Sequence, residues 1–529
     1  MPTCVIFEDE HLLVVNKPPG WNTHAPSPYA GEGIYDWLRY REPRWSRLAI
    51  IHRLDKETSG VIVFSKTELA NRSLTQQFTK REVQKKYVFL TDRKPKQSSV
   101  TIKSCLVRAG EKYVSRPRHA GAAVAETRFE SAGEQSQAYG GCWEVLAQPL
   151  TGRTHQIRVQ AAEAEMPILG DILYGKTDAR RMCLHAIELI LVHPANGREM
   201  TFKAPVEFGE DPAMLLRAAI IEPQMTNAYR LMHHTHDSGT GSCLDQLGDY
   251  LLFQSERPLT DQQLAAFGRQ MSSTNSKALY HKLLIRQTAT LPRSETSPKL
   301  ITGKAAPDCF AIRENGSQFE LSFSEGYSVG LFLDQRDNRR RLLTGYVSGE
   351  FELPACPEVL NLFAYTCGYS VCAAKAGART TSVDLSKKYL EWGKRNFELN
   401  GLDTARHDFI YGDAFDWLRR LTKKQRLFEI ILMDPPTFSQ SKQTGVFRVE
   451  KDYPKLIKLA LPLLKQDGVL FASTNAADWA PEDFLKTIEA AIHSSKRKIL
   501  QRQYFPQPPD FPISRREPGY LKTVWLRIE

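Results

Sequence analysis

The sequence has few cysteines and no long apolar segment. The odd number of its cysteines, nine among 529 residues, argues against a disulfide framework. No two of them form a CxxC pair, which argues against a structural zinc site. No run approaches the roughly 18 uncharged apolar residues of a transmembrane helix. Residues 1–10 hold three acidic side chains and no basic, apolar leader. We therefore expect a cytoplasmic protein with reduced thiols, no export and no membrane.

The composition is that of a folded, water-soluble protein, with 42% apolar and 25% charged residues. At roughly 100 to 200 residues per domain, the length predicts two to four domains. The formal net charge of +11 has the sign expected of a protein that meets phosphate backbones. Charge alone does not separate nucleic-acid binding from an ordinary basic surface, so the motifs have to decide.

The first part of the chain, residues 1–206, is expected to form a mainly antiparallel α+β domain. Strands are predicted at residues 5–7, 12–16, 61–65, 83–90 and 200–203, with a helix over residues 67–80. An acidic connector with two prolines is predicted at residues 207–224. These segments define the first domain and its boundary.

Two further domains are predicted after the connector. Residues 225–308 read as a small α+β domain with strands at 249–254 and 278–285, a helix near 261–271 and a polar linker at 288–308. In residues 309–529, apolar strands at 359–363, 380–383, 409–411, 430–433 and 469–473 alternate with helical stretches such as 386–400 and 482–493. This alternation predicts a Rossmann-like α/β domain with a doubly wound parallel sheet.

One motif of the first domain presents an aspartate in a turn. Residues 51–60 (IHRLDKETSG) place Asp55 between basic side chains, directly before a predicted strand. A lone aspartate in such a turn is most often a cap. The segment nevertheless resembles the signature of the RluA-type pseudouridine synthases, His-Arg-Leu-Asp followed by Thr-Ser-Gly. Further segments resemble that family in the correct order: 16–20, 85–87, 151–158, 167–175, and 184–186 with 193–194.

The resemblance implies a role for each residue of this site. Asp55 would attack or stabilise the sugar while the bond between uracil and ribose is broken and remade. Arg158, one turn into a helix opened by Thr154, would keep that carboxylate ionised. Tyr87 would stack on the target base and move a proton. No cofactor is expected in this half.

RNA contacts are expected from the same motifs. Catalysis on a base requires that the base leave the stack, and Arg53 resembles the family side chain that fills the gap. His52, Arg153 and His155 are expected to contact RNA beside it. The target of this half would therefore be a uridine in RNA.

A second constellation lies in the alternating region. Residues 361–370 (NLFAYTCGYS) follow its first strand and contain one glycine, Gly368, whereas a dinucleotide fingerprint needs three spaced glycines. A nicotinamide cofactor is therefore disfavoured. Asp384 follows the second strand, where a carboxylate can accept ribose hydroxyls, and Asp413 ends the third. A nucleoside cofactor without a pyrophosphate suits this arrangement.

The fourth strand of this region ends at residues 434–438 (DPPTF). As a lone tripeptide, Asp-Pro-Pro is more often a turn, but here it follows two other acidic strand ends. The set resembles class I S-adenosylmethionine methyltransferases of the RlmI and RlmK kind, which act on large-subunit ribosomal RNA. Supporting segments are 330–336, 385–392 with Asn396 and Asn400, 434–442, and, in the small domain, 227–231 and 247–251.

The resemblance implies how the cofactor is held. Its S-adenosylmethionine ligands would be Phe363, Tyr365, Thr366, Gly368, Asp384, Asp413, Asp434 and Pro435, with Asp434 also catalytic. Cys367 stands where the family usually has glycine, and we expect its side chain to crowd the methionine moiety. A metal site at His233, His234, His236 and Asp237 is not expected, because no second cluster matches this polar loop.

The two resemblances together predict a bifunctional enzyme that isomerises a uridine and methylates a nucleotide in 23S ribosomal RNA or its precursor. The acceptor is expected to be guanine N(7), because carbon methylation of cytosine needs a cysteine thiolate and residues 434–438 and 473–476 contain none. Three alternatives stay open: a cytosine-C(5) methyltransferase, a methyltransferase for tRNA or protein, and an RNA-binding scaffold with one inactive half. The oligomeric state is not predicted.

Overall fold

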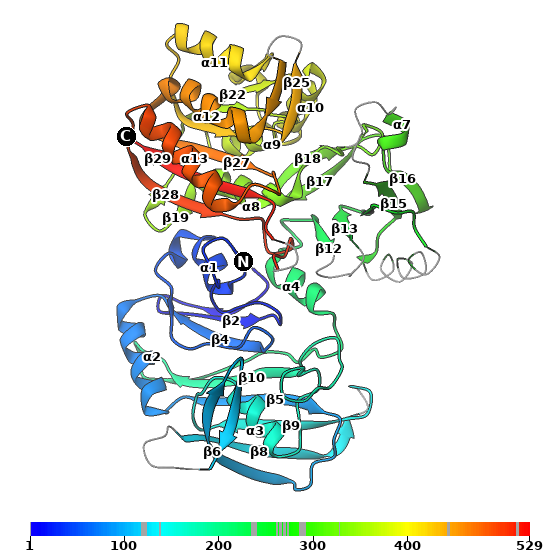
Figure 1. Cartoon of the computed structure of the whole chain (residues 1–529), viewed down its shortest axis with the longest axis vertical. Helices are drawn as coiled ribbons and strands as arrows, with labels where there is room; N and C mark the ends of the chain where they lie inside the picture. The colour runs from blue at the N-terminus through cyan, green and yellow to red at the C-terminus, as the bar shows by residue number, and fades with distance from the viewer. Residues whose placement is uncertain are drawn as a thin grey trace. The chain divides into compact units, whose positions relative to one another are not determined.

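The structure is a computed structural model (Figure 1), and it describes residues 2–117, 124–136, 139–233, 241–260, 263, 267, 271, 274–284, 293–326, 328–441, 445–514 and 518–529. The chain divides into two compact units. Unit 1 comprises Met1–Pro26, Glu32–Arg39 and Arg44–Glu222, and unit 2 comprises Ser27–Gly31, Tyr40–Pro43 and Pro223–Glu529. Among the described residues, no helix has the length and apolar character of a membrane-spanning segment.

Unit 1 is built on an 11-stranded sheet with the order β1-β2-β4-β10-β5-β9-β8-β6-β7, in which β11 pairs with β10 and β3 with β4. The strands are β1 Val5–Glu8, β2 Leu12–Lys17, β3 Ala49–Ile50, β4 Ser59–Ser65, β5 Gln84–Thr91, β6 Ser99–Ala109, β7 Lys112–Arg116, β8 Val124–Ser136, β9 Cys142–Pro149, β10 Leu184–Val192 and β11 Glu199–Lys203. Neighbouring strands run antiparallel except β4 and β10, which are parallel. The predicted mainly antiparallel α+β class is confirmed.

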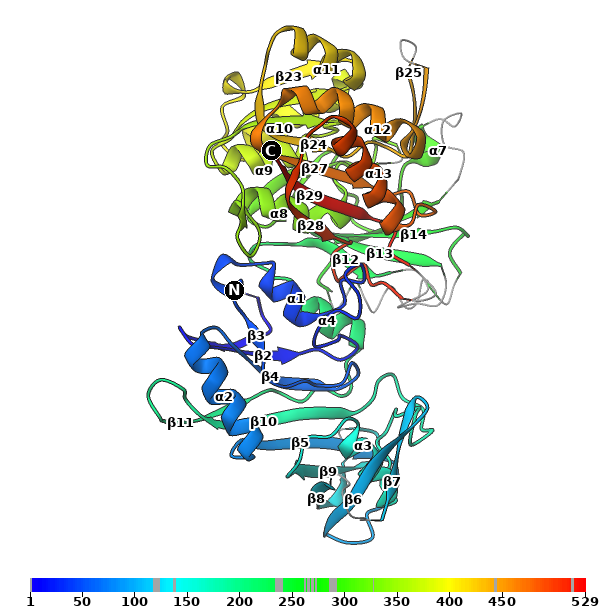
Figure 2. The same ribbon diagram turned by 60° about the vertical axis from the view of Figure 1, so that its left-hand side comes forward.

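The helices of unit 1 are α1 Ile34–Arg39, α2 Glu68–Lys80, α3 Gln156–Glu163 and α4 Pro212–Ile220. Helix α2 begins after Thr67, whose hydroxyl accepts a hydrogen bond from the Ala70 N–H, as a helix cap should. Its apolar side packs on β2 and β4, whereas that of α3 packs on β5, β8 and β9. Figure 2 shows these two helices at different places along the sheet. The apolar run of the predicted connector forms α4.

Unit 2 contains a five-stranded sheet with the order β12-β13-β14-β15-β16. Its strands are β12 Ala228–Met232, β13 Ser242–Leu247, β14 Tyr250–Ser255, β15 Ala278–Leu283 and β16 Lys299–Gly303. The linker predicted at residues 288–308 is wrong in part, because β16 lies within it and pairs with β15. All five residues of β16 are exposed, so no apolar alternation marks this strand. The helix predicted near residues 261–271 falls largely outside the described residues.

The remainder of unit 2 is a seven-stranded sheet with the order β23-β22-β21-β24-β27-β29-β28. Its strands are β21 Glu358–Leu362, β22 Arg379–Asp384, β23 Asp408–Tyr411, β24 Phe428–Met433, β27 Leu464–Thr474, β28 Ile499–Phe505 and β29 Lys522–Ile528. The five predicted strands are present and parallel. Strand β29 runs antiparallel to both of its neighbours, β27 and β28. Neither β28 nor β29 was predicted from the sequence.

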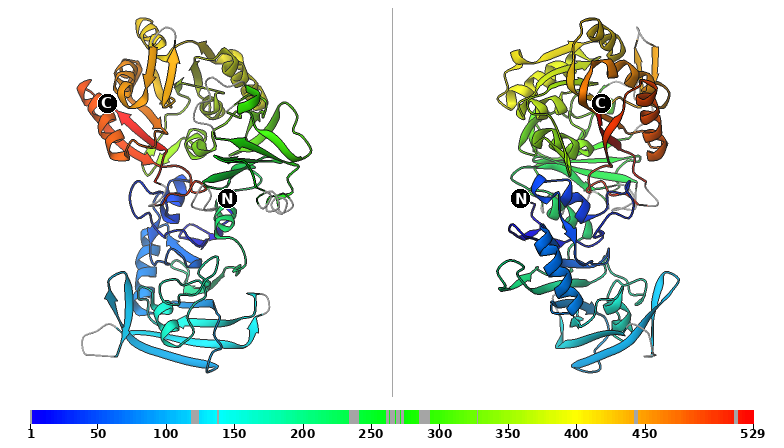
Figure 3. Two further views of the ribbon diagram at one scale, coloured as in Figure 1. Left: turned by 45° about the vertical axis from the view of Figure 1, so that its right-hand side comes forward. Right: turned by 90° about the vertical axis from the view of Figure 1, so that its left-hand side faces the viewer.

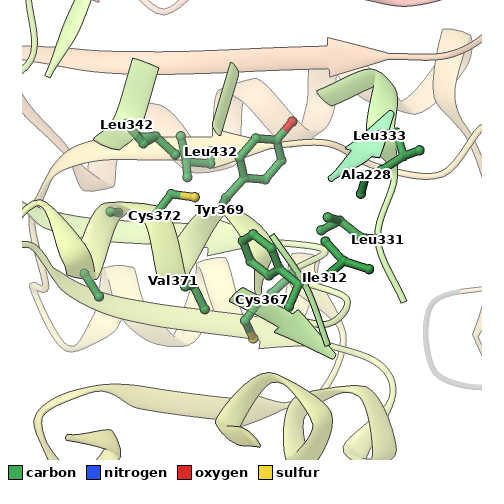
Figure 4. Packing of buried hydrophobic residues seen from close by; sticks show 14 of the residues in the cluster. Ala228, Ile312, Leu331, Leu333, Leu342, Cys367, Tyr369, Val371, Cys372 and Leu432 are labelled. Atoms are coloured by element: carbon green, nitrogen blue, oxygen red, sulfur yellow. The ribbon is translucent and has the colours of Figure 1, made fainter. Parts of the chain in front are cut away.

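Helices cover both faces of this sheet, as a doubly wound fold requires (Figure 3). They are α8 Arg336–Thr344, α9 Gly368–Lys375, α10 Lys387–Leu399, α11 Ala414–Lys423, α12 Val449–Ala460 and α13 Pro481–Ser494. Side chains of α8, α9 and α10 join one buried cluster, part of which is drawn in Figure 4, and those of α11, α12 and α13 join another. Successive strand residues, such as Val359 and Leu360, contribute to opposite clusters.

The short elements of unit 2 complete the description. Two hairpins precede the large sheet, β17 Phe310–Glu314 with β18 Ser317–Leu321 and β19 Tyr346–Ser348 with β20 Phe351–Glu352. A third, β25 Phe438–Ser441 with β26 Gly445–Arg448, follows β24, and α7 covers Arg293–Thr296. The sheet therefore brings the carboxyl ends of its five parallel strands to one edge, where both β24 and β21 lead into loops.

Candidate active sites

A cavity of about 810 Å³ in unit 1 gathers the residues predicted for the first site. Asp55 comes from the loop before β4, Tyr87 from β5 and Arg158 from α3. The four predicted RNA-contact residues, His52, Arg53, Arg153 and His155, line the same cavity. Three motifs that are distant in sequence thus converge on one site.

The loop that carries Asp55 is held on both sides of that residue. The Thr23 hydroxyl exchanges hydrogen bonds with the carbonyl and N–H of Leu54, at 2.9 and 3.1 Å. Lys17 Nζ donates to the Lys56 carbonyl at 3.1 Å. Gly60 ends the motif with φ +111°, and a Cβ there would lie 2.2 Å from the Ala186 carbonyl oxygen on β10. The motif therefore needs glycine because β4 meets β10 at this point.

Arg158 is tied more closely to Asp171 than to Asp55. Its Nε and Nη2 donate to the two Asp171 carboxylate oxygens at 2.8 and 2.9 Å, whereas Nη1 lies 3.7 Å from Asp55 Oδ2. Burial works against the Arg158 charge, but the bonds to Asp171 outweigh it and raise the pKa of the guanidinium. Asp171 was not predicted as a site residue, although it lies in one of the motifs, residues 167–175.

The helix that carries Arg158 begins later than predicted. It starts at Gln156 and not at Thr154, so Arg158 is its third residue. The Gln156 side chain explains the difference, because its Oε1 accepts hydrogen bonds from the Thr151 hydroxyl and the Arg153 N–H at 2.6 and 3.0 Å. These bonds fold residues 151–155 into a loop over the helix start.

His155 and Tyr87 face Asp55 in neutral forms. Burial lowers the pKa of His155 although Asp55 opposes this, and its Nε2 lies 3.9 Å from Asp55 Oδ2 while Nδ1 is 2.8 Å from the Tyr174 hydroxyl. Burial and the Asp55 charge both raise the pKa of Tyr87 above its usual range. Tyr87 is therefore a protonated phenol at neutral pH, and Tyr174 is a partner that the sequence did not predict.

The predicted RNA-contact residues differ in how firmly the protein holds their side chains. His52 stacks on Phe78, and its Nε2 accepts a hydrogen bond from the Val63 N–H at 3.2 Å. Burial and Lys85 lower the pKa of His52 to about 3, so it is uncharged. Arg53 and Arg153 are exposed at the cavity. These two arginines have the freedom and charge to meet a phosphate, while His52 is fixed to the protein.

In unit 2, residues 363–367 form a loop between β21 and α9 in which three side-chain-bearing residues, Phe363, Tyr365 and Cys367, have φ of +59°, +49° and +61°. The Asp384 carboxylate at the end of β22 holds this loop, accepting from the N–H groups of Tyr365 and Ser386, both at 2.8 Å. Burial raises the pKa of Asp384 against these bonds. The loop and Asp384 are therefore in direct contact at this edge of the sheet.

The same loop is anchored at Thr366 and Gly368. The Thr366 hydroxyl donates to the Gly330 carbonyl at 2.6 Å, and Asn396 Nδ2 donates to the Thr366 carbonyl at 2.9 Å. A Cβ on Gly368 would lie 3.1 Å from the Leu331 side chain, so the helix start approaches the 330–336 segment closely. These contacts bring together three of the segments on which the resemblance rests.

The side chain of Cys367 does not follow our expectation that it crowds the methionine moiety. It is fully buried and joins the core cluster of α9 and α10 (Figure 4), where its Sγ faces Gly393. The positive φ of Cys367 is the physical reason, because it turns the Cα–Cβ bond inward at the start of α9. Burial also raises the pKa of this thiol to about 12.

Asp434 at the end of β24 belongs to a buried polar network. Its Oδ2 accepts from Gln335 Nε2 at 3.1 Å, and the same amide nitrogen donates to the Ser473 hydroxyl at 2.8 Å. Asn338 Nδ2 donates to Gln335 Oε1 at 2.8 Å, which fixes the orientation of the Gln335 amide. Burial raises the pKa of Asp434 to about 6. Gln335 lies in the 330–336 segment but was not predicted to touch the site.

The other predicted residues of this edge are placed as follows. Pro435 is buried directly after Asp434. Asp413 caps α11, and its side chain accepts from the Asp416 N–H at 3.1 Å.

Among the described residues, no cluster of three potential metal ligands occurs. His233 is buried beside Arg230, while His234, His236 and Asp237 lie outside the described residues.

Comparison with known proteins covers both units. Residues 11–163 match the family model of RNA pseudouridylate synthases, and residues 244–527 match that of S-adenosylmethionine-dependent methyltransferases. A putative ribosomal RNA large subunit methyltransferase, YwbD of Bacillus subtilis, is 32% identical over 316 residues, covering 59% of this chain and 77% of that protein. Ribosomal RNA large subunit methyltransferase K of Neisseria meningitidis is 40% identical over 200 residues, covering 37% of this chain and 54% of that protein.

The matches to other relatives are partial. Ribosomal RNA large subunit methyltransferase K/L of a Psychrobacter species is 45% identical over 168 residues, which cover 31% of this chain and 20% of that protein. The chain thus spans about half the length of the Neisseria relative and a fifth of the length of the Psychrobacter relative.

Solved structures agree with the family of the second unit. A putative methyltransferase complexed with SAH has a TM-score of 0.52 and 31% identity, covering 65% of this chain and 88% of that one. A putative methyltransferase from Streptococcus mutans has a TM-score of 0.51 and 30% identity with the same coverage. The chain therefore belongs to the S-adenosylmethionine-dependent methyltransferases, and residues 11–163 of its first unit match the RNA pseudouridylate synthase family.

Proposed function

We propose that this chain isomerises a uridine in large-subunit ribosomal RNA and methylates a nucleotide of the same RNA. The observation that carries the proposal is the convergence of Asp55, Tyr87 and Arg158 on one cavity, in a chain whose second unit holds Asp384 and Asp434 at the ends of the two strands that flank β21. The printed names of the relatives, methyltransferases of large-subunit ribosomal RNA, support this RNA as the substrate. The net charge of +11 is consistent with it.

In the first site, Asp55 acts on the sugar of the flipped uridine. Arg158, held by Asp171, places a positive charge 3.7 Å from Asp55 Oδ2. Tyr87 keeps its proton and offers both a ring face for the base and a hydroxyl group. Arg53 is exposed and occupies the gap left in the RNA stack. No step of this account needs a cofactor.

The test of this half is Asp55→Asn in the intact chain. The amide keeps the shape of the carboxylate but is neither a nucleophile nor an anion, so pseudouridine formation should be lost while methylation continues. Carbodiimide-based detection of pseudouridine on ribosomal RNA measures the first activity. Asp178→Asn, an exposed residue after the 167–175 motif, is the matched control. Isomerisation by Asp55→Asn near the parent rate would refute the assignment.

In the second site, the residues present fit S-adenosylmethionine. Bound there, the cofactor supplies an electrophilic methyl group. The carboxylate of Asp384, at the end of β22, would hold the ribose hydroxyls, and the loop at Phe363, Tyr365 and Thr366, with Gly368, would hold the methionine part. Asp413 and Pro435 complete the edge. The backbone bonds to Asp384 leave lone pairs on both carboxylate oxygens for this purpose.

We further propose guanine N(7) as the methyl acceptor. This nitrogen is already nucleophilic and needs only to be positioned, whereas cytosine C(5) needs a thiolate. Cys367 and Cys372 are buried, and burial raises the pKa of each to about 12, so both remain thiols. Asp434 accepts hydrogen bonds from the guanine N–H groups. Its partner Gln335 holds the carboxylate in one orientation.

Chemical cleavage distinguishes the acceptors. RNA treated with the enzyme and S-adenosylmethionine should break at one guanine of 23S ribosomal RNA after borohydride and aniline. A protected cytosine in bisulfite sequencing would refute the N(7) assignment, and methylation of tRNA alone would refute the ribosomal substrate. Asp434→Asn should abolish the cleavage while leaving pseudouridine formation unchanged, which separates failure of one site from failure of the other.

A further inference from the structure

Unit 1 contains a second cavity, of about 220 Å³, that the proposed reaction does not use. Leu184 of β10 lines the catalytic cavity, and the next residue, His185, lines the second one. Successive residues of a strand point to opposite faces, so the two cavities lie on opposite sides of the sheet. The second cavity is lined by the segment around Lys17, by Ser59 of β4 and by α4.

Two buried cationic residues, Lys17 and Arg181, belong to the lining of this cavity, and neither makes an ion pair with the described residues. Lys17 is 0% exposed, and its Nζ donates to the carbonyls of Pro18, Trp21 and Lys56 at 3.0, 2.6 and 3.1 Å. Arg181 is 6% exposed. Among the described residues, no carboxylate oxygen lies within 4.0 Å of either cation. Buried charges are costly unless paired, so this arrangement calls for an anion.

The hydrogen bonds of Arg181 leave donors free. Its Nη2 donates to the Ser59 hydroxyl at 2.5 Å, Nη1 to the Glu207 carbonyl at 3.4 Å and Nε to the Met182 carbonyl at 3.4 Å. A guanidinium has five N–H groups, so one on each terminal nitrogen has no partner among the described residues. The side chains of Glu57 and Glu207 are exposed and make no ion pair with Arg181.

Apart from Glu207, whose side chain is exposed, the rest of the lining is uncharged. Ser59 Oγ lies 2.8 Å from His185 Nδ1, and His185 Nε2 lies 3.4 Å from the Ala204 carbonyl, which places the proton of the neutral ring on Nε2. Burial lowers the pKa of His185 to about 4, so the ring adds no charge. The Asn16 carboxamide lines the cavity and makes no hydrogen bond to the described residues.

We propose that this cavity is a binding site for a small oxyanion, held by the free N–H groups of Arg181 and by the Asn16 amide. Charge-assisted pairs of N–H groups on one guanidinium match the oxygens of a phosphate or carboxylate. The volume equals that of about seven waters at roughly 30 Å³ each, so a phosphate fits with room for a substituent. Burial lowers the pKa of the neighbouring Lys17 to about 7, although the charges of Glu57 and Asp55 oppose this.

The site lies behind the catalytic loop. Lys17 binds the carbonyl of Lys56, the residue after Asp55, and Ser59 follows on the same segment. Arg181 donates to Ser59, so an anion that fixes Arg181 stabilises the base of the loop that presents Asp55. This inference does not depend on the substrate of either active site.

The test is calorimetric titration of the intact protein with inorganic phosphate, at ionic strength kept constant with chloride. Ala218 lines the cavity from α4, so Ala218→Leu fills the space and keeps every charge. Arg181→Gln removes one cation. Both variants should weaken phosphate binding by about tenfold or more, because the charge-assisted bonds are lost. Ala213→Leu, on the same helix but outside the cavity lining, is the matched control and should bind as the parent does.

Three further arms make the outcome decisive. Arg153→Gln, in the catalytic cavity, should leave phosphate binding intact. Ribose 5-phosphate and acetate show whether a substituted phosphate or a planar carboxylate is preferred. The proposal is overturned if none of the three anions binds, or if Arg153→Gln abolishes binding while Ala218→Leu does not. Because Ala218→Leu deletes no hydrogen bond, its result stands even if Arg181→Gln fails to fold.

Discussion

The sulfur of Cys367 occupies the space that Gly393 leaves open on α10. A Cβ on Gly393 would lie 2.4 Å from Cys367 Sγ and 2.9 Å from its Cβ. Glycine inside a helix costs about 1 kcal/mol relative to alanine, and this contact explains why it is present. The cysteine at the cofactor loop is therefore a packing residue of the core.

This packing predicts a coupled pair of substitutions. Gly393→Ala should destabilise unit 2 by about 1–3 kcal/mol, because the added methyl group overpacks the core. In a Cys367→Gly background the same change should be neutral or stabilising. Urea unfolding of the four proteins of this cycle measures the coupling, and purely additive effects would contradict the contact.

Asp171 should control the activity of the first site without touching the substrate. Asp171→Asn removes the charge that holds Arg158 and lets the guanidinium turn away from Asp55. Pseudouridine formation should fall by up to roughly 100-fold, mainly in kcat, because a small misplacement is costly. Asp178→Asn serves as the control, and an unchanged rate in Asp171→Asn would show that Arg158 needs no such support.

Gln335 should act as a positioning residue for Asp434. Gln335→Met keeps the volume but removes the hydrogen bonds to Asp434 and Ser473. Methylation should fall mainly in kcat, and the pKa of Asp434 should rise further because a bond that favours its ionised form is lost. The pH profile of methylation measures this rise. Gln318→Met, at an exposed strand position, is the control. A fall in rate without a shifted profile would indicate a merely structural role.

The raised pKa of Asp434 also predicts a pH dependence. If the ionised form accepts hydrogen bonds from the acceptor base, methylation should decline as the pH falls through about 6.

The stability of the fold should depend on pH in the opposite direction. A carboxyl whose pKa is raised in the folded state stabilises the protein below its unfolded pKa, and this contribution is lost as the pH rises through about 6. Asp434→Asn should therefore remove the decline in stability between about pH 4 and 6. Thermal unfolding across this range checks it, and a parallel decline in the variant would contradict it.

The sequence predicted the regular parts of the fold because local signals agreed there. Thr67 caps a helix with an apolar side, and the mainly apolar strands near Val359 and Ile430 are buried on both faces. Strand β16 could not be found in this way, since its residues are exposed and it depends on pairing with β15. Neither the antiparallel β29 nor its edge partner β28 was predicted, although both are regular strands.

The candidate sites were predicted as sets of residues but not as networks. Asp55, Tyr87 and Arg158 were named from motifs, whereas the bond between Arg158 and Asp171 spans 13 residues and depends on how the intervening loop folds. Gln335 and Asp434 are 99 residues apart. The direction of the Cys367 side chain depended on its positive φ, which residue identity alone does not reveal for a cysteine.

The central claim, two activities on one RNA, is tested most directly by mass-spectrometric mapping of 23S ribosomal RNA from cells with and without the protein. Carbodiimide derivatisation makes pseudouridine visible by mass, and methylguanosine is visible without it. The account predicts that one pseudouridine and one N(7)-methylguanosine are present in the parent and absent from the deletion strain. Identical maps of 23S ribosomal RNA from the two strains would contradict it.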